Sequence, residues 1–372
     1  MPEVEQGHGD SRQLQEIAEY AAAELRPLAQ AIDQQGLYPR AFLVGLGQRG
    51  GFGSVVDGDP RVDLPGQLRV IAEVGRHCGA TAFLAWCQSA CVSYLAHAPL
   101  PGARQRYLQR VSEGGLLAGT GMSNALKHLA GIEKIRLRAR SVGDGYVVDG
   151  MLPWVSNLDR GHLLLTAAAL SDGGYVMLAI ETGADGVALH ACPAFCGMEG
   201  TSTWNVRLHS VAVAVDGVLA RPAQFDHFLN TIKPGLVLTQ AGMGLGVIAG
   251  CVDDLAQAAA LDHAANDFLV DGVKGVRAEL AGLRADAEAL AQQARTAPPQ
   301  LLAVLRLRAQ VSELALRAAQ SAMLHVGARG YLLRHPAQRR LREAMFVSIV
   351  TPALKHLRKE IFDIERAHAE VA

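Results

Sequence analysis

The sequence predicts an α+β protein whose helices and strands lie in separate blocks. Apolar residues recur with a helical period up to about residue 115, alternate with polar residues from about 116 to 230, and return to the helical period from 231 to 372. Helices and strands that do not alternate as βαβ units are typical of α+β folds. We therefore predict an N-terminal α-helical domain (1–115), a central β domain (116–230) and a C-terminal helical bundle (231–372).

The first domain is predicted to begin with an amphipathic helix. The stretch LQEIAEYAAAELRPLAQAID places apolar residues along one face, namely Leu14, Ile17, Ala21, Leu25 and Leu28. Prolines and the glycine-rich segment GLGQRGGFG then interrupt the helical pattern. Two further helices are predicted at about 64–75 and 80–98.

The glycine-rich segment contains a pattern that resembles a nucleotide-binding fingerprint. Gly45, Gly47 and Gly50 match GxGxxG. That pattern binds a pyrophosphate only where it follows a strand and opens the helix of a βαβ unit. Here it lies in a helical region, so we interpret it as a turn.

The central domain is predicted to consist of hairpins. In IRLRARSV, Ile135, Leu137 and Ala139 alternate with arginines, as in a half-buried strand. The turn GDG joins this strand to YVVDG. The segment LLLTAAALSDGGYVMLAI repeats the arrangement, and VRLHSVAVAV (206–215) adds another strand.

The third domain is predicted to be helical, with breaks at TAPPQ (296–300) and around GARGY (327–331). Two uncharged stretches, 79–103 and 234–252, have the length of membrane-spanning segments. The first contains polar residues and the second is dense in glycine, which fits helices enclosed by protein better than helices in lipid. We therefore expect no association with a membrane.

Charge and cysteine content exclude several classes of function. The 372 residues include 35 basic and 36 acidic side chains, so the net charge of −1 provides no field for binding nucleic acid. The six cysteines form no CxxC pair, which indicates buried thiols rather than a metal site or disulfides. The polar start MPEVEQGHGD is not a secretory signal, so we expect a cytoplasmic protein.

The end of the first predicted hairpin, MLPWVSNL (151–158), carries an unusual pair of side chains. Trp154 is one of only three tryptophans, and the hydroxyl of Ser156 follows two residues later. Trp154 either packs in the core of the β domain or forms a wall for a flat ligand, which a rigid aromatic plane buries at low entropic cost. These residues alone leave both interpretations open.

Five motifs together resemble the acyl-CoA dehydrogenase family of flavoproteins over nearly the whole chain. In chain order they are LRPLAQAIDQQGLYP, GARQRYLQRVSEGG, GDGYVVDGMLPWVSN, GMEGTSTWNVRLHSVAV and AMLHVGARGYLLRHPAQRRLREA. The resemblance implies FAD as cofactor, an acyl thioester as substrate, and a homodimer or homotetramer. For the fold it implies a barrel-like or sandwich β domain followed by a four-helix bundle.

The resemblance also implies roles for individual residues. Trp154 would cover one face of the isoalloxazine ring, and Ser156 would donate to N5 or accept from its N–H. Thr120, in LAGTGMSNALKHLAG, would hold the flavin pyrimidine. In the same loop, Ser123 would approach a phosphate, although a turn without any ligand is at least as common.

The C-terminal loop LHVGARGY is similar to the family loop that reaches the partner subunit's adenosine half. It keeps Gly327, Gly330 and Tyr331 but carries Arg329 in place of a small residue. The family arginine that binds the flavin pyrophosphate falls on Asp262 here, which would repel a phosphate. Arg329 either compensates for that charge or is a solvated surface residue.

The catalytic base of the family is missing from both of its usual places. The usual glutamate falls on Thr351, whose neutral hydroxyl is too weak a base, and the alternative position falls on about Leu236. Lys233 either orients a substrate or begins a helix without a catalytic role. His325 and His356 are the nearest remaining candidates for a base, although a histidine in such a position is more often structural.

Three functions are therefore open at this stage. The first is a flavin-dependent oxidoreductase that acts on an acyl-CoA or related thioester. The second is a monooxygenase of the same fold, which uses reduced flavin and O2 and needs no base for an α-proton. The third is a non-catalytic subunit of a heteromer whose sister subunit supplies the missing glutamate and arginine.

Overall fold

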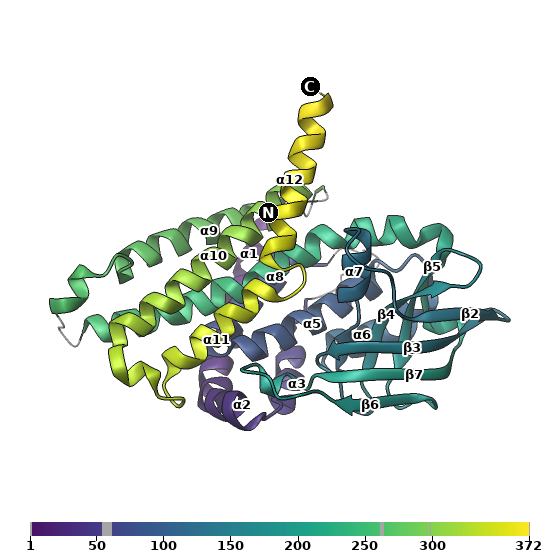
Figure 1. Cartoon of the computed structure of the whole chain (residues 1–372), viewed down its shortest axis with the longest axis horizontal. Helices are drawn as coiled ribbons and strands as arrows, with labels where there is room; N and C mark the ends of the chain where they lie inside the picture. The colour runs from purple at the N-terminus through teal and green to yellow at the C-terminus, as the bar shows by residue number, and fades with distance from the viewer. Residues whose placement is uncertain (1, 54–61, 261–263, 295, 298, 372) are drawn as a thin grey trace.

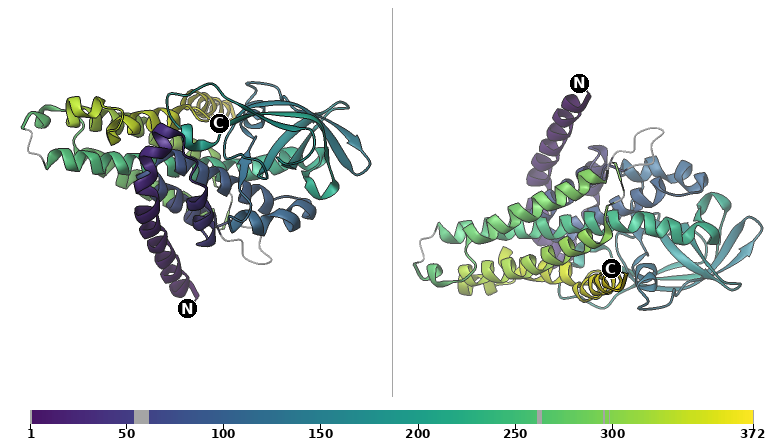
Figure 2. Two further views of the ribbon diagram at one scale, coloured as in Figure 1. Left: turned by 90° about the horizontal axis from the view of Figure 1, so that it is seen from below. Right: turned by 90° about the horizontal axis from the view of Figure 1, so that it is seen from above.

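The computed structural model describes residues 2–53, 62–260, 264–294, 296–297 and 299–371. It confirms the predicted order of helices, then strands, then helices. The sheet lies at one end of the molecule and the long C-terminal helices extend away from it (Figure 1). The two terminal helices, α1 (Pro2–Tyr20) and α12 (Leu354–Val371), project from the body (Figure 1, Figure 2).

The N-terminal helices pack around α5 (Gly79–Ala96), whose side chains are all buried. The other helices of this part are α2 (Ala29–Gln35), α3 (Arg40–Gln48), α4 (Leu64–His77) and α6 (Pro101–Ser112), and short π- and 3-10-helical turns (Ala21–Leu25 and Arg26–Leu28) join α1 to α2. The predicted apolar face is confirmed where Ile17, Ala21 and Leu25 are fully buried.

The GxGxxG glycines lie mostly in a helix, so their interpretation as a turn is wrong for two of the three. Gly45 and Gly47 belong to α3, and only Gly50, with φ of 70°, lies in a turn. A Cβ on Gly47 would lie 2.6 Å from the backbone nitrogen of Gly114. The glycine therefore permits close contact between α3 and the end of α6.

The central strands form one eight-stranded mixed sheet. The strands are β1 (Ala118–Thr120), β2 (Arg138–Val142), β3 (Gly145–Val155), β4 (Leu163–Leu170), β5 (Tyr175–Glu181), β6 (Val187–Ala191), β7 (Trp204–Val213) and β8 (Val218–Ala220). Their order is β6-β7-β3-β2-β4-β5-β8, with β1 parallel to β4. Both predicted hairpins, β2–β3 and β4–β5, are confirmed as antiparallel pairs. Apolar residues from both halves of the sheet share one core, which indicates strong curvature.

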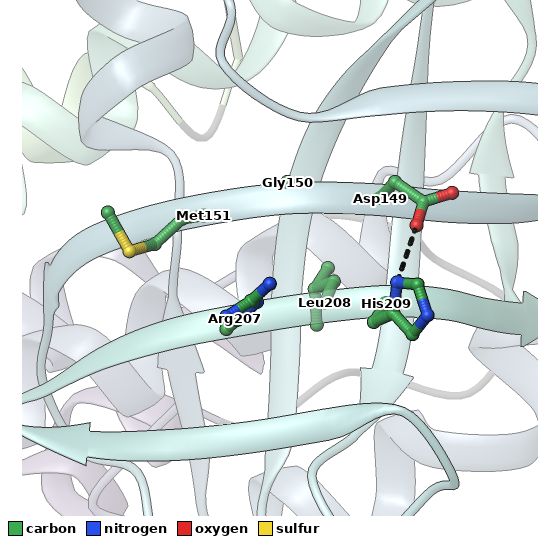
Figure 3. A pocket seen from close by; sticks show the side chains of 6 residues that line it. All are labelled: Asp149, Gly150, Met151, Arg207, Leu208 and His209. Atoms are coloured by element: carbon green, nitrogen blue, oxygen red, sulfur yellow. Dashed lines mark ion pairs between the residues drawn. The ribbon is translucent and has the colours of Figure 1, made fainter.

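A bulge between β3 and β7 leaves a recess of about 420 Å³ on the sheet surface (Figure 3). It is lined by Asp149, Gly150, Met151, Arg207, Leu208 and His209. The His209 ring lies 3.6 Å from the Asp149 carboxylate and is largely exposed to solvent. None of the residues predicted to bind a cofactor lines this recess.

The C-terminal helices are centred on α8 (Pro222–Ala259), which packs against α4, α5, α9, α10 and α11. The others are α9 (Val273–Gln293), α10 (Leu301–Val326) and α11 (Pro336–Ile349). The helix α8 begins ahead of the expected domain boundary at residue 231, and Pro222 occupies its first turn, where a proline costs no hydrogen bond. Within the described residues, α8 is long and apolar enough to span a membrane, but 94% of its most apolar window is buried inside the protein.

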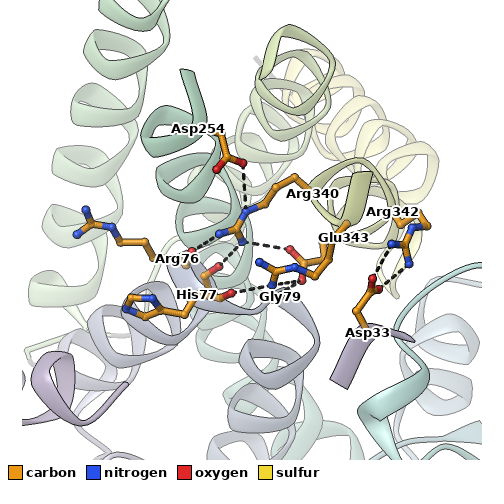
Figure 4. A network of polar contacts seen from close by, with 10 residues as sticks. Asp33, Arg76, His77, Gly79, Asp254, Arg340, Arg342 and Glu343 are labelled. Carbon is orange, nitrogen blue, oxygen red and sulfur yellow. Dashed lines mark hydrogen bonds and ion pairs between the residues drawn. The ribbon is translucent and has the colours of Figure 1, made fainter. Parts of the chain in front are cut away.

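A buried polar network fastens α11 to the corner between α4 and α5 (Figure 4). Arg339 donates to the carbonyl of His77 at 2.7 Å, and Arg340 donates to that of Gly75 at 3.2 Å. Glu343 accepts from both guanidinium groups, at 3.1 and 3.2 Å, and from the backbone N–H of Gly79 at 2.8 Å. The network fixes the position of α11 against the N-terminal helices.

The expectation of buried thiols is confirmed for four of the six cysteines. Cys78, Cys87, Cys91 and Cys251 are buried and unpaired, whereas Cys192 is half-buried and Cys196 is exposed. Burial raises the pKa of each of the four buried thiols, so they remain protonated.

Candidate functional site

Trp154 does not pack in the core of the sheet. It is the penultimate residue of β3, its φ is 56°, and its side chain is 65% exposed. The indole meets the ring of Phe195 edge to face, with centroids 6.2 Å apart and planes at 84°. The interpretation as a core tryptophan is therefore wrong, and the ring is available to a ligand.

The residues beside Trp154 extend this surface onto α11. Arg342 of α11 donates to the carbonyl of Cys196, next to Phe195, at 3.3 Å. Met345 and Ile349 follow Arg342 at helical spacing, and both are exposed. We name the exposed side chains of Trp154, Phe195, Met345 and Ile349 the apolar wall. Trp154 and Phe195 are in contact, and Met345 and Ile349 are exposed on the helix that meets the segment of Phe195. Contiguous exposed apolar groups mark sites for ligands or partners.

Ser156, two residues after Trp154, belongs to a chain of hydroxyl groups. Its Oγ is 2.6 Å from Oγ1 of Thr203, which is 2.8 Å from Oγ1 of Thr201. Thr201 donates its proton to the carbonyl of Met198 at 2.7 Å. Thr203 must therefore donate to Thr201, and Ser156 to Thr203. The remaining hydrogen-bonding capacity of Ser156 is that of an acceptor.

The strand end that carries these residues is held by a buried polar network that the sequence did not indicate. The Asn157 amide donates to the carbonyl of Ala118 at 2.7 Å and to the Gln88 amide oxygen at 3.2 Å. Its own oxygen accepts from the Tyr38 hydroxyl at 2.7 Å, and burial raises the pKa of that hydroxyl. Asn157 has a φ of 60°, a conformation that asparagine tolerates well. The identity of this residue was the one signal available in the sequence.

Thr120 is the last residue of β1, and Ser123 is the first residue of α7 (Ser123–Leu129), which follows after two residues. Oγ1 of Thr120 lies 3.0 Å from the Tyr94 hydroxyl and accepts from the N–H of Met122 at 3.3 Å. Ser123 begins a helix rather than a turn. Its hydroxyl donates to Oγ1 of Thr351 at 2.9 Å, so the structure places it against the segment that follows α11.

The two expected positions of a catalytic carboxylate are occupied by neutral groups with structural contacts. The carbonyl of Thr351 accepts from the Gln240 amide at 3.0 Å, and Gln240 in turn accepts from Arg308 at 3.0 Å. Arg308 is completely buried, which lowers its pKa to about 10. Leu236 is buried, and its carbonyl accepts from the indole N–H of Trp86 at 3.1 Å.

The other titratable candidates differ in their partners. Lys233 forms an ion pair with Glu360 of α12. His325 is a satisfied core residue, because its Nδ1 lies 2.8 Å from the carbonyl of Ser321. His356 differs from it, since its Nδ1 is buried and has no hydrogen-bond partner among the described residues.

Gly327 and Gly330 lie far from the other predicted site residues of the same chain. They belong to a 3-10 turn (Gly327–Tyr331) that precedes α11, whereas Thr351 follows α11. The 14 residues of α11 separate the two ends by about 21 Å. Gly327 has a φ of 71° and ends α10, and Arg329 is exposed. Asp262 lies outside the described residues.

A second recess, of about 230 Å³, lies between α5 and α8. Its lining includes Leu64, Ser93, His97, Ile232 and Leu236. Neither this recess nor the one on the sheet surface includes Thr120, Trp154 or Ser156 in its lining.

Known domains match most of the helical parts of the chain. Residues 10–115 match the domain described as acyl-CoA dehydrogenase, N-terminal domain, and residues 238–351 match acyl-CoA dehydrogenase, C-terminal domain. Cyclohex-1-ene-1-carbonyl-CoA dehydrogenase of Geobacter metallireducens is 23% identical over 354 residues, which cover 90% of this chain and 92% of that protein.

Solved structures have the same fold at low sequence identity. A glutaryl-CoA dehydrogenase of Mycobacterium smegmatis in complex with FADH2 has a TM-score of 0.79 and 13% identity, covering 96% of this chain and 94% of the other. The dibenzothiophene monooxygenase of Paenibacillus sp. A11-2 has a TM-score of 0.82 and 17% identity, covering 96% and 97%. Both confirm the predicted fold.

Proposed function

The chain belongs to the acyl-CoA dehydrogenase family, and from this premise we propose that it is a flavin-dependent oxidoreductase acting on an acyl-CoA or related acyl thioester. The proposal is supported above all by the exposed indole of Trp154, which presents an aromatic plane at the edge of the apolar wall. A flat, largely apolar ring system fits such a surface.

The residues around Trp154 match the needs of a flavin ring. We assign Trp154 to one face of the ring, Ser156 to the N5 edge and Thr120 to the pyrimidine. Ser156 is limited to accepting a hydrogen bond, so it favours a ring that carries a proton at N5. Bound there, a flavin supplies a two-electron acceptor for a hydride. We leave Ser123 out of this assignment, because its hydroxyl is engaged by Thr351.

In this reaction the chain must bind the thioester, exclude water and remove an α-proton. We propose that the usual glutamate is replaced by Thr351, whose hydroxyl cannot accept that proton at neutral pH. Thr351 instead holds Ser123 and Gln240 in place, so its role is to position the loop that follows α11.

The proposal is tested by measuring FAD binding to the purified protein through quenching of flavin fluorescence. We expect wild-type protein to bind FAD and Trp154→Ala to bind it about tenfold more weakly, since a lost aromatic stack is worth about 1.5 kcal/mol. Met151→Ala is the matched control, because Met151 is an exposed apolar residue of the same strand that lies outside the apolar wall. Wild-type protein that neither carries nor binds FAD contradicts the proposal.

A second candidate is a monooxygenase that uses reduced flavin and O2. The observation that favours it is the absence of a carboxylate at both usual positions, Thr351 and Leu236, since such a reaction needs no α-proton base. The two candidates differ in substrate dependence: an acyl-CoA reduces the bound flavin under anaerobic conditions only in the dehydrogenase. Flavin that stays oxidised with acyl-CoA, while reduced flavin and O2 yield an oxygenated product, favours the monooxygenase.

We also propose that the chain works as a homodimer or homotetramer. Tyr331, at 81% exposure, and its exposed neighbours Leu332 and Leu333 lie beside Gly327 and Gly330, where the adenosine half of a partner's cofactor would bind. Light scattering of the purified protein tests this, and a stable monomer that binds FAD only when mixed with a second chain of the family supports the heteromer instead.

A further inference from the structure

The helix α7 lies alongside the start of α12. Ser123, the first residue of α7, contacts Thr351 through their hydroxyl groups at 2.9 Å. Lys127 follows Ser123 by one turn of α7, and His356 follows Thr351 by five residues, so both lie near this contact. The backbone N–H of His356 donates to the carbonyl of Ala353 at 2.7 Å, so the chain turns tightly between Ala353 and His356. This turn brings His356 into the first turn of α12, five residues after Thr351, where the family's glutamate is expected.

His356 carries a polar atom that its surroundings do not satisfy. Its Nδ1 is buried and accepts or donates no hydrogen bond among the described residues. An unsatisfied buried nitrogen costs about 1–3 kcal/mol. Such a group in a folded protein calls for an explanation, and a substrate or a bound water that completes its hydrogen bond is one.

The charges around His356 favour its neutral form. Burial lowers the pKa of the imidazole, and the ammonium groups of Lys355 and Lys127 lower it further, whereas Glu133 acts in the opposite direction. Glu133 itself is engaged by Lys127 and Arg136, each at 3.5 Å. One turn further along α12, Glu360 is paired with Lys233. His356 is therefore a neutral imidazole, and the carboxylates of Glu133 and Glu360 are already paired with basic side chains.

We propose that His356 is the base that removes the α-proton of the acyl thioester in place of the family's glutamate. The step rests on the proposed function. The α-C–H bond breaks, its proton moves to the imidazole, and its electron pair forms the new carbon–carbon double bond. A hydride would leave the β-carbon at the same time, and a flavin held by Trp154, Ser156 and Thr120 would supply the acceptor for its two electrons. The neutral imidazole is the reactive form, so the rate rises with pH and levels off above the lowered pKa of His356.

The test follows the proton directly rather than the overall turnover. Wild-type protein is incubated with butyryl-CoA in D2O without an electron acceptor, and deuterium at the α-carbon is measured by mass spectrometry. We expect exchange with wild-type protein and a loss of at least about a hundredfold with His356→Gln. His368→Gln is the matched control, because His368 is an exposed residue of the same helix. With His356→Ala, added imidazole should restore part of the rate.

The outcomes separate this proposal from the proposed function. FAD affinity and melting temperature are measured for each variant, and both should match wild type in His356→Gln. Exchange that persists in His356→Gln, or wild-type protein that shows no exchange, overturns the role of His356. Absence of FAD binding contradicts the proposed function instead, whereas exchange itself needs only the base and the thioester.

Discussion

Removal of Glu343 is expected to destabilise the protein strongly. This carboxylate is almost completely buried and accepts three hydrogen bonds, from Arg339, Arg340 and the backbone of Gly79 (Figure 4). Glu343→Ala leaves two guanidinium groups without this carboxylate as their counter-ion, at side-chain exposures of only 10% and 6%. Removal of one partner of a buried ion pair lowers the free energy of unfolding by about 3–5 kcal/mol. We therefore expect the free energy of unfolding to fall by that amount.

The measurement is urea denaturation followed by far-ultraviolet circular dichroism. Glu313→Ala serves as the control, since Glu313 is also a helical glutamate that pairs with an arginine, Arg358, but both side chains are exposed. An exposed pair contributes about 0–1 kcal/mol. If Glu343→Ala costs no more than Glu313→Ala, the network does not fasten α11 as we argue.

Two further predictions concern helix packing and pH. Gly246→Ala should destabilise the protein by about 1–3 kcal/mol, because the new Cβ would lie 2.4 Å from the carbonyl oxygen of Ala72. Gly282→Ala should stabilise it by up to about 1 kcal/mol, because the new Cβ would meet no atom within 4 Å. Thermal unfolding of both variants checks that the two effects have opposite signs. His162 is buried, with Nε2 3.0 Å from the Arg40 guanidinium, and burial above all lowers its pKa. Between that pKa and about 6.5 the unfolded chain binds more protons, so stability should fall as the pH drops below about 6.5, and His162→Gln should weaken this dependence in denaturation curves from pH 8 to 5. A slope that is unchanged in the variant would show that other groups cause it.

The sequence was most informative where the signal is local. Alternation around Leu137 and the turns of both hairpins depend on neighbouring residues, and the structure confirms them. The helical pattern was expected to resume at about residue 231, whereas α8 begins at Pro222 and continues through Pro234. A barrel-like or sandwich β domain was expected, but a hydrophobic period alone does not give the order of the strands in the curved sheet.

The candidate site was predicted only in part, because some of its residues are joined by contacts that leave no local pattern in the sequence. Trp154 stood out because tryptophan is rare in this chain, and its exposure agrees with the interpretation as a ligand wall. The network of Asn157, Gln88 and Tyr38 joins residues up to 119 positions apart, which no local pattern reveals. The sequence also ranked His325 and His356 equally, and only the hydrogen-bond partners of each ring distinguish them.

The guanidinium of Arg342 touches two distant parts of the chain at once. It donates to the Asp33 carboxylate at 2.6 Å, across 309 residues of sequence, and to the carbonyl of Cys196 across 146. A surface that depends on contacts between residues far apart in the sequence forms late in folding. A fragment that ends before α11, or one that lacks α2, is thus expected to form secondary structure without forming the apolar wall against which a cofactor would bind.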